Sequence, residues 1–153
     1  LGRDGRESVP DYAMVNARYV SMKEGRIEIE SAAKDAAFDF IHRQKHPALF
    51  CVQSFDARAL EEIHRLDATI ATAWLFALPN GWKLGFKALS FRPTIMSPNY
   101  LVTRKANVLQ AHRLGISVIP WTVNEEKEMK RLIALKVDGM ITDYPDVLKA
   151  LLK

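Results

Sequence analysis

Apolar runs and amphipathic segments alternate along this chain from about residue 26 to its C-terminus, and this alternation leaves few folds open. Residues 118–145 show the pattern most clearly, because an apolar run is followed by a polar turn, a segment with helical periodicity and a second apolar run. Strands that alternate with helices predict a parallel sheet with right-handed crossovers. Strands that are apolar along most of their length are typical of a sheet covered on both faces. The sequence therefore predicts an α/β fold.

The predicted helices begin and end at residues that suit those positions. Asp56 and Asn124 precede amphipathic segments and can cap the free backbone N–H groups of a helix. Gly115 stands where a helix would end, and Pro145 where the last one would begin. The predicted strands are residues 26–31, 48–55, 69–76, 94–100, 117–124 and 137–143.

Length and composition indicate one domain. The chain has 153 residues, 48% of them hydrophobic, which is enough to bury a core. Residues 1–20 show no sustained period and contain two glycines and a proline, so we expect an arm or loop there and a single domain over residues 21–153.

Charge, cysteine content and hydropathy exclude several classes of protein. The net charge of +4 is spread over the chain without a basic block between aromatic residues, so we expect no nucleic-acid partner. No run approaches the roughly 18 apolar residues of a transmembrane segment. The single cysteine, Cys51, lies in an apolar run, which fits a buried thiol and a cytoplasmic location.

Two α/β architectures compete: an open doubly wound sheet and a closed (β/α)8 barrel. The open sheet usually has a glycine-rich turn after a strand, and neither G-x-G-x-x-G nor G-x-x-x-x-G-K occurs in this sequence. Polar residues instead gather at the predicted strand ends, which is where barrel active sites are built. We therefore expect a (β/α)8 TIM barrel. These polar residues are Glu28, Glu30, Ser54, Ser97, Thr122, Asn124, Thr142 and Asp143.

The sequence IPWTVNEEKEMKRLIALKVDGMITDYP, residues 119–145, resembles the C-terminal signature of the glycerophosphodiester phosphodiesterase family. In that family a strand ending Trp-Thr-Val-Asn leads through a helix to Val-Asp-Gly-Ile-Ile-Thr-Asp-Tyr-Pro, from which only Met140 departs. VQSFD at 52–56 and RIEIES at 26–31 are similar to two further strands. The resemblance implies a (β/α)8 barrel that uses a divalent metal, calcium or magnesium, to hydrolyse glycerophosphodiesters to glycerol 3-phosphate and an alcohol.

The family's opening motifs are not found in this sequence. They are His-Arg-Gly, Pro-Glu-Asn-Thr, Glu-x-Asp and His-Asp, and they supply two catalytic histidines and two metal carboxylates. His42, His64 and His112 are each followed by Arg, but none of these pairs is followed by Gly. We therefore expect roughly the last five or six strands of the barrel, with the catalytic residues unassigned and the chain inactive alone.

Two glutamates are candidate site residues. Glu28 and Glu30 share one face of a strand, and a divalent cation is one way to accommodate carboxylates inside a barrel. By resemblance, Glu28 matches a metal ligand of the family. Glu30 matches a pocket lysine that contacts the phosphate, so its charge is opposite to the one expected there. The alternative is an exposed edge strand whose glutamates are solvated.

Trp121 is the third candidate. The resemblance places it in the substrate pocket, where its ring would form an apolar wall beside the glycerol moiety. The alternative is ordinary core packing of a large aromatic side chain.

The expected partner is a small-molecule phosphodiester substrate. A partial barrel would also leave two strand edges open, residues 26–31 and 137–143, and open edges favour self-association or cover by the N-terminal arm. The alternative function is a non-catalytic, barrel-derived binding or assembly module.

Overall fold

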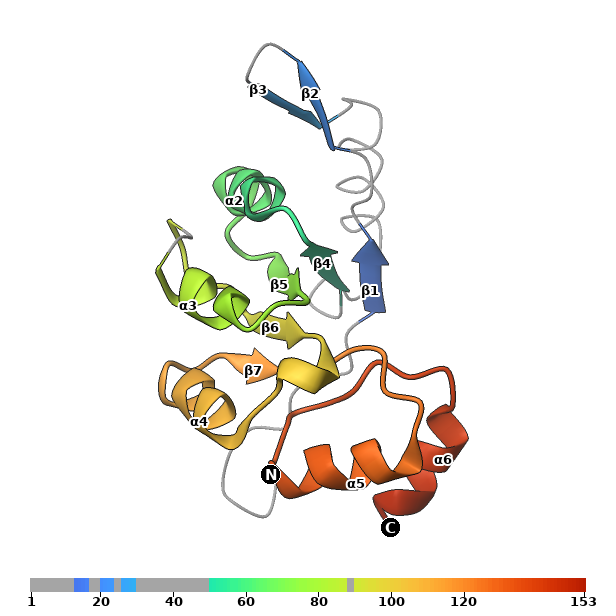
Figure 1. Ribbon diagram of the computed structural model, residues 1–153. Helices are drawn as coiled ribbons and strands as arrows, with labels where there is room; N and C mark the ends of the chain where they lie inside the picture. Colours follow the sequence, from blue (N-terminus) through green and yellow to red (C-terminus); the bar gives the residue numbers. More distant parts are fainter. Residues whose placement is uncertain (1–12, 17–19, 24–25, 30–49, 88–89) are drawn as a thin grey trace.

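Five parallel strands form the main sheet of the computed structural model, which describes residues 13–16, 20–23, 26–29, 50–87 and 90–153. All four strand pairs of this sheet are parallel, and the strands follow one another in the sheet in the same order as along the chain (Figure 1). The predicted α/β fold with a parallel sheet is therefore confirmed. The strands are β1 (Ala13–Asn16), β4 (Phe50–Ser54), β5 (Ala71–Phe76), β6 (Ile95–Pro98) and β7 (Ser117–Val118).

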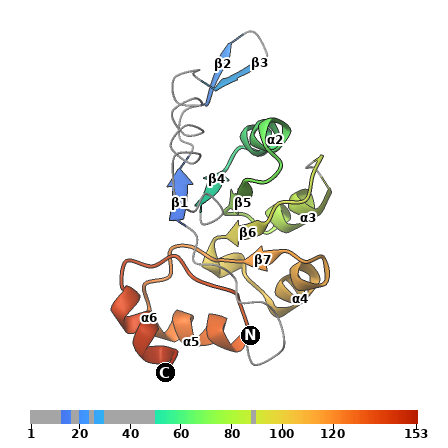
Figure 2. The ribbon, with the colours of Figure 1, turned by 180° about the vertical axis from the view of Figure 1, so that it is seen from behind.

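Helices alternate with these strands from β4 onward. In Figures 1 and 2, α2, α3 and α4 lie on one side of the strands, while α5 and α6 lie beyond β7. None of the described helices has the length and apolar character needed to cross a membrane. The helices are α2 (Ala57–Leu66), α3 (Asn80–Lys87), η2 (Tyr100–Val102), α4 (Lys105–Arg113), α5 (Glu126–Ala134) and α6 (Pro145–Leu151).

Most of the expected helix ends are confirmed. The Asp56 side chain accepts a hydrogen bond from the backbone N–H of Arg58 and caps α2, and further hydrogen bonds from the Arg58 side chain hold the pKa of Asp56 below its usual value. Gly115 follows α4 with a φ of 72°, and Pro145 begins α6. Asn124 is the exception, because the cap position of α5 is Glu125 and Asn124 forms other contacts.

The last predicted strand runs beside β7 without forming a regular ladder. Asp138 N donates to Val118 O at 2.9 Å, Ile141 N donates to Pro120 O at 2.9 Å, and Val123 N donates to Ile141 O at 2.8 Å. Pro120 has no N–H to donate, which interrupts the pairing. Residues 137–143 therefore extend the parallel arrangement past β7.

The two faces of the sheet pack into different apolar clusters, because successive side chains of a strand point to opposite faces. Val52, Trp74 and Met96 pack against buried residues of α2 and α4. Their neighbours along the strands face the other way and form a second cluster. Its buried residues are Cys51, Ala73, Ile95 and Ile119.

Cys51 is fully buried in the second cluster. Burial raises the pKa of its thiol to about 12, so the thiol stays protonated at neutral pH. This agrees with an inert, buried cysteine.

The N-terminal part departs from the expectation. The predicted edge strand appears as β3 (Arg26–Ile29), which pairs antiparallel with β2 (Val20–Lys23) in a separate two-stranded sheet (Figure 1). The place beside β4 is taken by β1, from the segment expected to be an arm or loop. A hairpin partner close in sequence costs little loop-closure entropy, and a strand pattern alone does not specify its partner. Ala33, Ala37, Phe38 and Ile41 recur at helical spacing and predict a helix over residues 31–45, which lie outside the described residues.

Candidate active site at the carboxyl ends of the strands

Parallel strands bring their carboxyl ends to one edge of the sheet, and several predicted polar residues meet there. Ser97 is fully buried, and its Oγ donates to Ile119 O at 2.7 Å. Ser54 Oγ accepts from Asp56 N at 3.0 Å in the turn that leads into α2. Both serines therefore hold the backbone at this edge.

Trp121 is held at the same edge by three hydrogen bonds. Its indole Nε1 donates to Ser97 O at 2.7 Å. Its backbone N donates to Pro98 O at 3.0 Å, and its carbonyl accepts from Tyr100 N at 3.0 Å. The side chain is half-buried, so part of the ring is left for contact with a ligand.

Phe55 extends the aromatic surface of Trp121. The two rings meet edge to face, with centroids 5.3 Å apart and an interplanar angle of 86°. Phe55 directly follows β4 and is 60% exposed. Sequence reasoning assigned it no role, although an aromatic residue placed just after a strand end was the available signal. Together, Phe55 and Trp121 form an aromatic wall at the carboxyl ends of β4 and β7.

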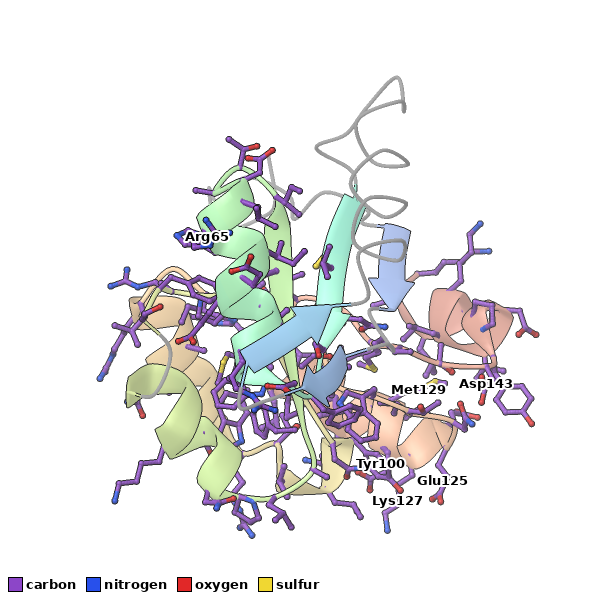
Figure 3. All side chains as sticks on the ribbon, turned by 90° about the horizontal axis from the view of Figure 1, so that it is seen from above. Arg65, Tyr100, Glu125, Lys127, Met129 and Asp143 are labelled. Carbon is purple, nitrogen blue, oxygen red and sulfur yellow. The ribbon has the colours of Figure 1, made fainter. Side chains whose placement is uncertain are left out.

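A second group of polar contacts joins the segment that follows β7 to residues 137–143. Asn124 Nδ2 donates to Asp143 Oδ2 at 2.7 Å, and Asn124 Oδ1 accepts from Asp143 N at 3.0 Å and from Thr142 Oγ1 at 3.3 Å. Asp143 lies on the α6 side of the molecule, far from Arg65 of α2 (Figure 3). Asn124 thus ties residues 137–143 to the end of the β7 segment.

The two candidate glutamates stay predictions. Glu28 lies in β3 opposite Ser21, in a region where only the backbone is described, and Glu30 is outside the described residues. Within the described part of the chain, no three His, Cys, Asp or Glu side chains gather into a group that could hold a metal.

The two histidines on described helices have packing partners. His64 of α2 stacks on Phe91, with ring centroids 4.4 Å apart. His112 of α4 places Nε2 2.8 Å from Asp138 Oδ2. Both histidines lie in helices, as the sequence predicts.

Comparisons with known proteins agree with this geometry. A glycerophosphodiester phosphodiesterase of Bacillus subtilis (strain 168) is 29% identical over 108 residues, which cover 69% of this chain and 37% of the relative. A Silicibacter pomeroyi structure, assigned to the glycerophosphoryl diester phosphodiesterases, has a TM-score of 0.70 at 25% identity and matches 92% of this chain and 50% of its own.

A further solved structure is that of an Oleispira antarctica phosphodiesterase in complex with the product sn-glycerol-3-phosphate. It has a TM-score of 0.66 at 21% identity and matches 81% of this chain and 49% of its own. The solved relatives are TIM-barrel proteins. This chain spans about half their length and 37% of the Bacillus subtilis relative. Residues 13–147 match the glycerophosphoryl diester phosphodiesterase family, and the chain belongs to that family.

Proposed function

We propose that the protein hydrolyses glycerophosphodiesters to glycerol 3-phosphate and an alcohol, and that this chain forms part of the (β/α)8 barrel that does so. The family match over residues 13–147 carries the proposal. Two further observations support it. The strands are parallel, as in a barrel, and an aromatic wall stands at their carboxyl ends, where barrel enzymes bind substrate.

In this proposal Trp121 and Phe55 hold the glycerol moiety. Their edge-to-face contact and the hydrogen bond from the indole to Ser97 O keep the wall in one orientation before substrate arrives. A preorganised apolar surface excludes water from one side of the substrate and costs little entropy on binding. The phosphodiester end of the substrate would then point toward the face of the sheet that carries Cys51, Ala73 and Ile95. That face would be the barrel interior.

The proposal includes a divalent cation, calcium or magnesium, with Glu28 as one ligand and the others from the family's opening motifs, which are not found in this sequence. When bound, such an ion would polarise the phosphoryl oxygens and stabilise charge in the displacement. Glu30 would lie near the phosphate in the pocket. Its negative charge and the lack of the family's histidine motifs in this sequence favour the alternative of a non-catalytic binding module.

Activity toward glycerophosphocholine tests the proposal. The 153-residue chain is expected to show no turnover with calcium or magnesium, because the family's two catalytic histidines are not found in its sequence. A longer product of the same gene that carries those motifs should be active and should lose activity with EDTA. In that product Trp121→Ala should lower kcat/KM about tenfold, since an aromatic contact and a pocket wall are lost.

Trp121→Phe is the matched control, because it keeps an aromatic ring but not the donor to Ser97 O, and its effect should be smaller. Full activity of the 153-residue chain would contradict the expectation that it is inactive alone, and a Trp121→Ala variant as active as the parent would contradict the proposed role of Trp121. A longer product that binds a phosphodiester without hydrolysing it would favour the binding module.

We also propose that the open ends of the sheet self-associate. The described sheet ends at β1 on one side and at residues 137–143 on the other. Strand edges present unpaired N–H and C=O groups to other chains. Light scattering should give a mass above that of the monomer, and a monomer at every concentration up to the solubility limit would refute this association.

A further inference from the structure

We propose that the loops after β5 and β6 form a docking surface for an anionic lipid bilayer. The surface consists of two exposed leucines and three exposed cations and is called the β5–β6 surface below. Its residues are Leu78, Lys83, Leu101, Arg104 and Lys105. The inference concerns membrane binding alone and does not depend on hydrolysis.

The two loops are neighbours and are joined by hydrogen bonds. Asn99 N donates to Phe76 O at 2.7 Å, directly at the carboxyl ends of β5 and β6. Trp82 Nε1, in the first turns of α3, donates to Val102 O of η2 at 3.0 Å. The Asn99 side chain also accepts from Leu101 N at 3.0 Å. These hydrogen bonds join residues 77–83 and 99–105 into one unit.

Both apolar residues of the surface are exposed. Leu78 is 65% exposed and Leu101 is 68% exposed. A single exposed leucine is ordinary on a protein surface, but here one projects from each of two adjoining loops. Exposed apolar side chains can enter the boundary between lipid headgroups and acyl chains.

The positive charge of these two loops indicates an anionic partner. Lys83, Arg104 and Lys105 are exposed, and none of them forms an ion pair with a carboxylate in the part of the chain that the structure describes. Residues 77–83 and 99–105 contain no Asp or Glu. Cations beside exposed leucines fit an anionic bilayer better than a neutral apolar partner.

The neighbouring sector of the same rim carries charges of both signs. Glu125, Glu126 and Lys127 at the start of α5 are exposed, and Glu126 forms an ion pair with Lys130 at 2.6 Å. An anionic membrane would be attracted less to that mixed sector than to the β5–β6 surface. Because Tyr100 N donates to Trp121 O at 3.0 Å, the docking surface adjoins the candidate site.

Sedimentation with vesicles tests the inference. The 153-residue chain should bind vesicles of phosphatidylglycerol and phosphatidylcholine, and not vesicles of phosphatidylcholine alone. Leu78→Ser with Leu101→Ser should weaken binding by at least about tenfold, since two apolar side chains are lost from the boundary. Lys83→Gln with Arg104→Gln and Lys105→Gln should weaken it by about a hundredfold, because each cation near an anionic leaflet contributes about fivefold.

The matched control is Leu109→Ser with Leu152→Ser, which removes two exposed leucines on α4 and at the end of α6. This control should bind as the parent does. Three results would overturn the inference: no binding of the parent to anionic vesicles, equal losses in the control, or binding that survives both sets of substitutions. A parent oligomer that becomes monomeric with Leu78→Ser and Leu101→Ser would also overturn it, because a second copy would then occupy the surface.

Discussion

Replacing Gly81 by alanine is expected to destabilise the protein by about 3 kcal/mol, at the upper end of the usual cost of overpacking. A Cβ added at Gly81 would lie 2.2 Å from Cδ2 and 2.7 Å from Cβ of Phe76. Phe76 is buried and packs edge to face on Trp82 and Trp74, with centroids 5.2 Å and 6.0 Å apart. The clash therefore reaches the fixed base of a side chain that has no room to rotate.

Urea denaturation measures this effect as a lower unfolding midpoint. Gly139→Ala is the matched control, since its new Cβ would lie 3.7 Å from the nearest atoms, all in Ile119, at ordinary van der Waals distance. That control should change the free energy of unfolding by less than about 1 kcal/mol. Equal midpoints for the two variants would show that α3 can move away from β5.

Replacing Asp138 by alanine should lower the free energy of unfolding by about 3 kcal/mol. The buried N–H of Val118 would lose its acceptor, and the contact between Asp138 and His112 would also be lost. Asp138 Oδ2 accepts from Val118 N at 2.7 Å and lies 2.8 Å from His112 Nε2. Val118 is fully buried, so water cannot replace the lost acceptor without opening the structure. The Asp138 side chain thus satisfies a β7 N–H where the strand ladder is irregular.

Three variants distinguish the contribution of the hydrogen bond to Val118 N from that of the contact with His112. His112→Ala leaves the bond to Val118 N intact and should cost less than Asp138→Ala. Asp138→Asn keeps an acceptor oxygen and should also be milder. Asp146→Ala removes an exposed carboxylate in the first turn of α6 and serves as the control. The assignment fails if His112→Ala is as damaging as Asp138→Ala, since the bond to Val118 N would then contribute nothing.

The amino-acid pattern predicted the helices and strands of the C-terminal two thirds well. The apolar runs at residues 48–55, 69–76 and 94–100 contain β4, β5 and β6, and the amphipathic segment after Asp56 contains α2. This succeeded because each strand is buried on both faces and each helix on one, so burial alone produces a readable period. The signature at residues 119–145 likewise indicated the family, because it consists of particular residue types at fixed spacing.

Three features were decided by contacts between residues distant in sequence. The strand at residues 26–29 was predicted, but its antiparallel partner was not, because alternation specifies which face is buried and not which strand lies beside it. Asn124 looks like a helix cap in sequence, yet its amide reaches Asp143, 19 positions away. Trp121 was predicted to be a pocket residue and Phe55 was assigned no role, and only the parallel packing of their strands brings the two rings into contact.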